Sequence, residues 1–236
     1  MNNPLVHAAR FYLPPLEIDP EGTVLVFDKP YQCTSFDLVN KVKFYLKKEL
    51  KLKVKVGHAG TLDPLATGVL IICVGKFTKR IPEIQSQEKE YTGTIKLGAT
   101  TPGFDLEKPI DQEFDYLHIT QEMVLKASKT FLGETLQVPP QYSAVKVNGK
   151  RGYDFARSGE EVALAAKTIF IKEFEITRFE LPEVDFRIVC SKGTYIRAIA
   201  RDFGQLLNSG AHLTSLCRTK IGEYRVEDAI VVIDNE

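Results

Sequence analysis

The sequence predicts an α+β fold, built on a central, mostly antiparallel mixed sheet that is flanked by helices and loops. Strand-like and helix-like segments follow one another without the regular strand–helix–strand rhythm of a parallel sheet. Residues 91–97 alternate between two faces, as half-buried strands do, with Tyr91 at the entrance. Residues 69–74 form a short, continuously apolar run that is typical of a fully buried strand.

The first part of the chain is predicted to form an arm, a strand and a helix. Residues 1–20 carry prolines at positions 4, 14, 15 and 20, and we expect an N-terminal arm there rather than a core element. Thr23–Phe27 is a short apolar strand that ends in a turn. Ser35 is a good N-cap for a helix with an apolar face and a lysine face. The apolar face consists of Leu38, Val42, Tyr45 and Leu46.

The middle of the chain continues the mixed pattern. Residues 100–115 are acidic and rich in turn-forming residues, which indicates a surface excursion. A helix is expected around 120–131. Two strands are expected at 168–180 and 184–190, because apolar residues alternate along the second of them.

The most amphipathic helix follows a turn at residues 191–194. Arg197 and Arg201 lie four residues apart on it and therefore project from one side. The apolar positions at helical spacing are Ile196, Ile199, Ala200, Phe203, Leu206 and Leu207.

Composition excludes several classes of protein. With 236 residues the chain can form one large domain or two small ones, and it has no apolar stretch of roughly 18 residues that a membrane span requires. The N-terminus lacks the pattern of a signal peptide. The four cysteines are scattered and the four histidines lie far apart, so we expect no metal site, no disulfide framework and a cytoplasmic location. No nucleotide-binding motif is present, and we expect no cofactor.

The formal charge is zero, but the charges are segregated along the chain. Residues 41–55 hold seven lysines against one acid, and residues 186–225 hold seven Lys or Arg against two acids. Residues 81–122 hold nine acids against three lysines. If the basic segments meet in space they form a face that can bind phosphates. An ordinary solvated lysine helix would give the same pattern.

One loop contains an acid that requires an explanation. The stretch GHAGTLDPLATGVL, residues 57–70, has glycines and prolines that prevent one regular element, so a bent loop runs through His58, Thr61 and Asp63. The loop leads directly into the apolar run. Taken alone, an aspartate before a proline is more often a turn residue than a catalyst.

This stretch resembles the catalytic motif of the TruB family of pseudouridine synthases. Other segments resemble the family's motifs in the same order, over about residues 20–230. They are FDKPYQCTSFDLVNKVK (27–43), KEYTGTIKLGATT (89–101), VPPQYSAVKVNGKRGYDFARSGE (138–160), CSKGTYIRAIARDFGQLL (190–207) and GAHLTSLCRTKIGEY (210–224).

The resemblance implies an enzyme that isomerises uridine to pseudouridine in the T-loop of tRNA, at Ψ55, after flipping the nucleotide out of the RNA. It implies that Asp63 is the catalytic residue, whether it attacks the sugar or the base or acts through a glycal. Arg197 would keep Asp63 ionised through charge-assisted hydrogen bonds, and Tyr91 would stack on the detached base. Because the reaction transfers no electrons or atoms, it needs no cofactor and no metal.

The remaining implied contacts concern the substrate and the RNA backbone. His58 would contact the RNA around the flipped nucleotide, and Tyr195 and Leu216 would line the pocket. A thumb-like insertion at about residues 137–168 and the lysine helix would hold the tRNA stem and loop. The expected backbone contacts are Lys41, Lys43, Lys47, Lys48, Lys146, Lys150 and Arg151.

Three features depart from the family's pattern. Gln32 stands where the motif usually has glycine, so we expect a turn there without a positive φ angle. Cys217 replaces an arginine next to Arg218. The sequence ends at Glu236, where longer members continue into a PUA domain, so we expect one catalytic domain over residues 21–236 and no PUA domain.

Two other functions are compatible with the sequence. One is a relative that acts on RNA chosen by a guide RNA within a ribonucleoprotein. The other is an RNA chaperone in which Asp63 is incidental. The first interpretation expects the T-arm of tRNA as partner, with no membrane and no obligate protein partner.

Overall fold

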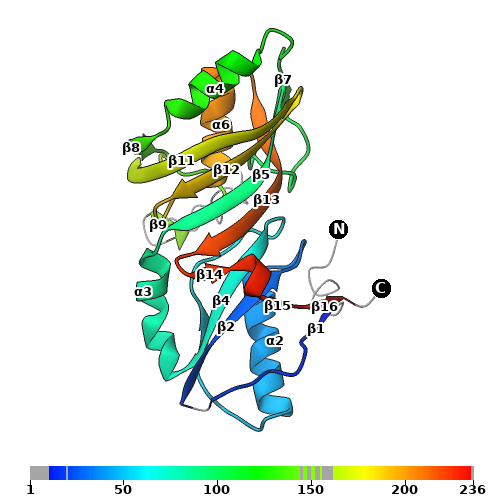
Figure 1. Ribbon diagram of the computed structural model, residues 1–236, viewed down its shortest axis with the longest axis vertical. Helices are drawn as coiled ribbons and strands as arrows, with labels where there is room; N and C mark the ends of the chain where they lie inside the picture. The colour runs from blue at the N-terminus through cyan, green and yellow to red at the C-terminus, as the bar shows by residue number, and fades with distance from the viewer. Residues whose placement is uncertain are drawn as a thin grey trace. The chain divides into compact units, whose positions relative to one another are not determined.

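A computed structural model describes residues 11–19, 21–143, 146–147, 150–151, 155 and 162–234 (Figure 1). The chain forms two compact units, one of residues 1–91 with 216–236 and the other of residues 92–215. The boundaries fall inside two strands, β5 (Lys89–Leu97) and β13 (Ala211–Ile221).

The first unit is built on strand β4 (Thr67–Gly75). On one side β4 pairs antiparallel with β2 (Gly22–Lys29), and β15 (Ile230–Val231) extends the sheet parallel to β2. The residues of β13 that belong to this unit pair parallel with β4, and β3 (Val56–His58) also pairs with β4. The expected strand at 23–27 is therefore confirmed.

Strand β4 is buried on both faces, which explains its unbroken apolar run. Leu70, Ile72 and Val74 pack in a core that includes residues of helix α2 (Ser35–Lys48), which lies against the sheet (Figure 1). Residues 69, 71 and 73 pack in a second core with Ile84 of helix α3 (Ile81–Ser86). The prediction of a fully buried strand at 69–74 is confirmed.

Two details at the start of the chain differ from expectation. Phe11 and Leu16 are buried in the core with α2, so the described part of the expected arm, residues 11–19, contributes to the core. The helix N-cap is Thr34, one residue before Ser35. Thr34 and Asp37 form a reciprocal capping box, because the Thr34 hydroxyl accepts from Asp37 N–H and the Asp37 carboxylate accepts from Thr34 N–H.

The shorter elements of this unit complete its frame. Strand β1 (Phe11–Tyr12) pairs antiparallel with β16 (Ile233–Asp234), and β14 (Tyr224–Arg225) pairs with the end of β13. Two 3₁₀ helices cover residues Lys76–Arg80 and Val226–Asp228.

The second unit contains a sheet in the order β13-β5-β12-β11-β8. Strands β11 (Lys167–Glu180) and β12 (Glu183–Cys190) form a long antiparallel hairpin, as expected from the sequence. Strand β8 (Gly133–Gln137) pairs with the start of β11. The alternation of β5 is also confirmed, since Ile95 and Leu97 are buried.

Helices α4 (Gln121–Lys129) and α6 (Ile196–Leu206) lie on one face of this sheet (Figure 1). Phe174 of β11 contacts Phe203 of α6, with ring centroids 5.6 Å apart. The predicted apolar residues of α6 are buried except Leu206, which is exposed; Leu207, the C-cap residue, is buried as predicted.

The segment predicted as a surface excursion is only partly on the surface. It contains the short strands β6 (Ala99–Thr100) and β7 (Gln112–Glu113), which pair with each other, followed by turns. However, Thr101 and Asp105 are buried. Strands β9 (Lys146–Val147) and β10 (Lys150–Arg151) form a short ladder in the expected thumb, 13 of whose 32 residues lie outside the described part of the chain.

Candidate active site

Asp63 lies in a loop of the first unit, residues 59–66, between strands β3 and β4. The N–H of Ala59 donates to the carbonyl of Ile71 at 2.8 Å, which fixes the start of the loop on the sheet. The N–H of Ala66 donates to the carbonyl of Asp63 at 3.1 Å, which closes a turn at its end. The Asp63 side chain is partly exposed at this turn. The loop is called the catalytic loop below.

The backbone of the catalytic loop is held by three buried polar side chains from three other elements. They are Lys29 at the end of β2, Ser35 at the start of α2 and Arg218 in β13. Each has at most 2% of its surface exposed. Because buried polar groups require partners, these side chains and the loop fix one another.

Ser35 binds the residue just before Asp63. Its Oγ accepts a hydrogen bond from Leu62 N–H at 2.8 Å and donates one to the Leu62 carbonyl at 3.0 Å. A single hydroxyl thus satisfies both backbone polar groups of the buried Leu62.

Arg218 binds the loop on the other side. Its Nη2 donates to the Gly60 carbonyl at 3.1 Å and its Nε donates to the Val69 carbonyl at 2.9 Å. A third contact, from Nη1 to the Thr61 carbonyl, is longer at 3.5 Å. The planar guanidinium therefore joins the loop to the start of β4.

Gly68 allows this approach. A Cβ atom at Gly68 would lie 2.3 Å from the carbonyl oxygen of Arg218, and the φ angle of Gly68 is +96°. Any side chain there would push β4 away from β13 and displace the Arg218 contacts. The N–H of Gly68 also donates to the carboxylate of Asp28 at 3.0 Å.

Lys29 joins the catalytic loop to the loop before α2. Its Nζ donates to the carbonyls of Pro30, Cys33 and Pro64. Burial lowers the pKa of Lys29 to about 8, although nearby charges, including Asp63, favour its protonated form. Lys29 therefore carries its charge at neutral pH at a cost in desolvation.

Gln32, in the loop that Lys29 holds, corrects one expectation. Its φ angle is +59°, so the turn does use the left-handed conformation that a glycine adopts more easily. Gln32 thus adopts a left-handed conformation at the position where the family's motif usually has glycine. Cys217, the other substituted position, is half-buried and lies next to the retained Arg218.

Arg197 lies in the second unit, in the first turn of α6, as predicted. It is 6% exposed and is held by three groups. Nη1 donates to the Gly103 carbonyl at 3.0 Å, Nη2 donates to the Tyr142 carbonyl at 2.9 Å, and Nε lies 3.5 Å from Oδ2 of Asp105. It is therefore not a solvent-exposed helix arginine. Asp63 belongs to the other unit, and its ion pair with Arg197 stays a prediction.

Asp105 is a site residue that the sequence analysis missed. It lies in the acidic segment that is expected on the surface, whereas its side chain is buried beside Arg197. Its carboxylate also accepts from Glu107 N–H at 3.0 Å. No periodicity marks such a residue, because it is a single acid among several in a turn-rich segment.

Tyr195 precedes α6 and is fixed by Gln137 at the end of β8. The Gln137 side chain accepts from Tyr195 N–H at 2.8 Å and donates to the Tyr195 carbonyl at 3.1 Å. Gln137 is buried, and its side chain bonds the backbone of the N-cap residue Tyr195, whose own side chain makes no capping hydrogen bond. This pair places Tyr195, and with it Arg197, at the start of the helix.

The other predicted substrate residues lie in the first unit. Tyr91 is buried in β5, and Leu216 in β13 is half-buried. His58, at the end of β3, is half-buried as well, and burial lowers its pKa. The nearby Arg218 guanidinium acts in the same direction, so His58 is neutral at pH 7.

The predicted RNA-binding residues fall into two groups. Lys43, Lys47 and Lys48 are exposed on α2, whereas Lys41 is partly buried and donates to the Phe11 carbonyl. The side chains of Lys146, Lys150 and Arg151 lie outside the described part of the structure.

Within the described residues, no group of His, Cys, Asp or Glu side chains is arranged to hold a metal ion. All four cysteines are described, and each is a free thiol. No described helix has the length and apolar character needed to cross a membrane.

The chain is similar to known proteins over most of its length. A family described as "TruB family pseudouridylate synthase (N terminal domain)" matches residues 47–196, a range that contains Asp63 and Tyr91 and ends one residue before Arg197. The class of protein is thus that of the pseudouridylate synthases. Among curated relatives, tRNA pseudouridine synthase B of Phocaeicola vulgatus is 59% identical over 213 residues, covering 90% of this chain and 91% of the relative. The protein of the same name from Flavobacterium johnsoniae is 58% identical and covers 89% of this chain and 93% of the relative. The chain belongs to the TruB family.

Solved structures support the fold. A chain in an H/ACA RNP bound to a substrate RNA containing 2′-deoxyuridine has a TM-score of 0.64 at 27% identity, over 90% of this chain. A chain in a Cbf5-Nop10-Gar1 complex has a TM-score of 0.67 at 28% identity, over 94% of this chain. This chain spans 51% and 56% of those two solved chains, about half of their length. The α+β assignment is confirmed.

Proposed function

We propose that this chain isomerises uridine to pseudouridine in the T-loop of tRNA, at position 55. The observation that carries the proposal is an identity of 59% to a tRNA pseudouridine synthase B over 90% of this chain. The enzyme breaks the N1–C1′ bond of the target uridine, turns the base and rejoins it through C5. The tRNA substrate makes the T-arm the expected RNA partner.

Asp63 is the proposed catalytic residue, acting on the sugar or the base of the flipped nucleotide. The observed frame suits this role, because the catalytic loop is fixed through backbone groups by Lys29, Ser35 and Arg218. These hydrogen bonds are made by backbone groups of the loop, so they remain in place when the carboxylate acts on the substrate. Holding a reactive group in one geometry is a large part of catalysis in such sites.

Arg197 is the proposed partner of Asp63, and the contacts within its own unit suit it for the task. The Gly103 and Tyr142 carbonyls and the Asp105 carboxylate set the plane of the guanidinium before any substrate binds. A planar group fixed in this way can clamp a carboxylate in two places. Asp105 is a positioning residue in this proposal.

The other side chains are assigned to substrate and RNA. Tyr91 stacks on the detached base, Tyr195 and Leu216 line the pocket, and His58 contacts the RNA as a neutral imidazole. The exposed lysines of α2, with Lys146, Lys150 and Arg151 of the thumb, contact phosphates, so binding falls as salt rises. We place the reaction in the cytoplasm, without a metal, a cofactor or an obligate protein partner.

Release of tritium from C5 of uridine in a T-arm stem-loop tests the proposal. Purified protein alone, with EDTA present, is expected to release tritium, whereas Asp63→Ala is expected to bind the RNA but release none. Asp228→Ala, an exposed aspartate of the same unit, serves as the matched control and is expected to act like the wild type.

Each alternative has its own outcome in this assay. Activity that appears only after a guide RNA or another protein is added would favour the guide-dependent function. Full tritium release by Asp63→Ala would remove Asp63 from catalysis. If neither protein releases tritium while both bind the RNA, the chaperone function is favoured.

A further inference from the structure

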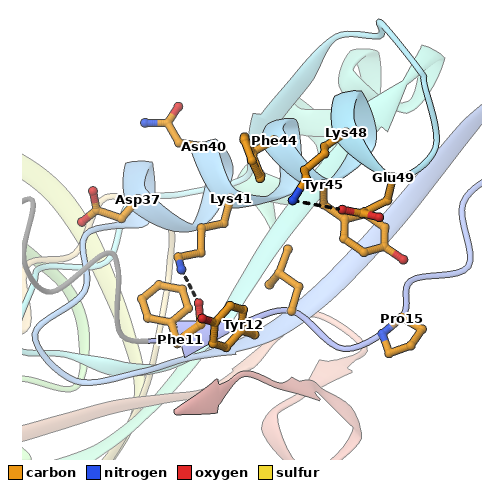
Figure 2. A pocket seen from close by; sticks show the side chains of 11 residues that line it. Phe11, Tyr12, Pro15, Asp37, Asn40, Lys41, Phe44, Tyr45, Lys48 and Glu49 are labelled. Atoms are coloured by element: carbon orange, nitrogen blue, oxygen red, sulfur yellow. Dashed lines mark hydrogen bonds and ion pairs between the residues drawn. The ribbon is translucent and has the colours of Figure 1, made fainter. Parts of the chain in front are cut away.

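A groove of about 840 Å³ runs between helix α2 and residues 11–15 of the first unit. Figure 2 shows Phe11, Tyr12 and Pro15 on one side, and helix residues from Asp37 to Glu49 on the other. The described elements that form it belong to one unit. Two of its lysines, Lys41 and Lys48, are among the expected phosphate contacts, but its aromatic residues have no assigned function. Its volume lies within the range of about 300–1,000 Å³ that is typical of ligand sites.

Large aromatic rings line this groove and remain open to solvent. Tyr12 is 57% exposed and Phe44 is 64% exposed. The helix also exposes Phe36, which is 60% exposed two turns before Phe44. Rings that contribute so little to the core of this unit, and that are gathered along one groove, indicate a binding surface.

Lysines accompany these rings. The Nζ of Lys48 lies 5.5 Å from the centre of the Phe44 ring, and that of Lys43 lies 5.7 Å from the centre of the Phe36 ring. Lys41 lies 4.3 Å from the Phe11 ring and donates to the Phe11 carbonyl, so it fixes the floor of the groove to the helix.

The positive charge near the groove comes from its surroundings on helix α2. Asp37 and Glu49 balance Lys41 and Lys48 among the residues that line the groove. Asp37 accepts hydrogen bonds from Thr34 in the helix cap, and Glu49 lies 3.8 Å from Lys48. Lys43 and Lys47 are exposed on the same helix and leave residues 35–49 with an excess of two positive charges.

We propose that this groove binds an unpaired stretch of RNA, with bases stacked on Tyr12 and Phe44 and phosphates beside the lysines of α2. Exposed aromatic rings accompanied by lysines are the features by which proteins bind single-stranded nucleic acid. The inference rests on the proposed function, which supplies an RNA as the ligand.

Two other occupants fit the groove less well. A second copy of this surface would bring lysines against lysines, and like charges across an interface oppose association. An apolar peptide would cover the rings but would gain nothing from the lysines.

Fluorescence anisotropy with a labelled ten-nucleotide oligoadenylate tests this site, because that probe contains no uridine for the active site. A blunt-ended RNA duplex serves as the paired control. The wild type is expected to bind the oligoadenylate more tightly than the duplex. Tyr12→Ala and Phe44→Ala are each expected to weaken oligoadenylate binding by about 5- to 100-fold, since stacking on one ring is lost. Both rings are exposed, so the variants are expected to fold.

Two further variants sharpen the result. Phe170→Ala removes a ring that is 49% exposed in the second unit and is expected to bind as the wild type does. Lys48→Gln is expected to lower the slope of log affinity against log salt by about 0.7, the value of one phosphate contact to a single strand.

The outcomes separate this proposal from the proposed function. Wild-type affinity in both ring variants would overturn the groove as an RNA site even if tritium release from the T-arm is normal. Self-association that sedimentation detects in the wild type and not in Phe44→Ala, with unchanged oligoadenylate binding, would show that a second copy occupies it. Conversely, oligoadenylate binding that depends on the rings, without tritium release, would support the groove and remove only the enzymatic function.

Discussion

Replacing Ser35 by alanine tests whether the catalytic loop is held by its buried partners. The substitution removes the one hydroxyl that binds both Leu62 N–H, at 2.8 Å, and the Leu62 carbonyl, at 3.0 Å. Ser35 and Leu62 are both buried, so water cannot easily replace the hydroxyl. Each buried polar group that loses its partner costs about 1–3 kcal/mol, and relief of the hydroxyl's own desolvation offsets a part of it. We expect the free energy of unfolding to fall by about 2–4 kcal/mol.

The same change is expected to slow the reaction, because Leu62 precedes Asp63. A displacement of about 1 Å at a catalytic group can cost on the order of 100-fold in rate. Urea unfolding measures the stability, and single-turnover release of tritium from C5, at a temperature where the variant stays folded, measures the chemical step. We expect the single-turnover rate to fall at least tenfold.

Ser209→Ala is the matched control. Ser209 is also buried, but its hydroxyl has no hydrogen-bond partner among the described residues. Its removal is expected to change the free energy of unfolding by less than about 0.5 kcal/mol, because no bond is lost. If Ser35→Ala matches this control in stability and keeps the wild-type rate, the account of the held loop is wrong.

Three other perturbations follow from the site. Arg197→Lys is expected to lose about 100-fold or more in turnover, because one ammonium cannot reach the Gly103 and Tyr142 carbonyls and a carboxylate together; near-normal tritium release would contradict this. Gln32→Gly is expected to leave stability unchanged or to raise the free energy of unfolding by up to about 1 kcal/mol, since glycine relieves the positive φ angle; Gln32→Val, measured by the same urea unfolding, is expected to lower it. The pKa of Lys29 is about 8 in the folded chain against an ordinary value of 10.5, so the unfolded state binds the extra proton between these pH values and stability rises with pH across that window. The difference between the two pKa values corresponds to about 3 kcal/mol in the free energy of unfolding. Urea unfolding at pH 7 and at pH 10 measures this rise, which is expected in the wild type and not in Lys29→Met.

Much of the fold is visible in the sequence because local periodicity reports burial. Strand β4 is buried on both faces and reads as an unbroken apolar run, and α6 reads as an amphipathic helix. The ends of helices are harder to predict, because neighbouring residues can serve equally well as the N-cap. Thr34 rather than Ser35 caps α2, and the difference has a physical reason, since the Ser35 hydroxyl is already used by Leu62.

The site is less predictable than the fold. Asp63 and Arg197 could be named because their motifs resemble those of a known family, whereas Asp105 and Gln137 act through contacts that no local pattern encodes. A buried polar residue is defined by its partners, and those partners are distant in sequence. The positive φ angle of Gln32 could not be foreseen either, because the surrounding contacts impose a conformation that the residue itself disfavours.

The long reach of Arg218 also has a consequence during synthesis on the ribosome. The carbonyl of Val69 and the guanidinium that binds it are separated by 149 positions in the chain. At a translation rate of about 5–20 residues per second, the nascent loop waits about 7–30 s before this clamp has even been made. Throughout that interval the residues around Asp63 have been synthesised without Arg218, so we expect no modification of RNA by the nascent chain before β13 has been made.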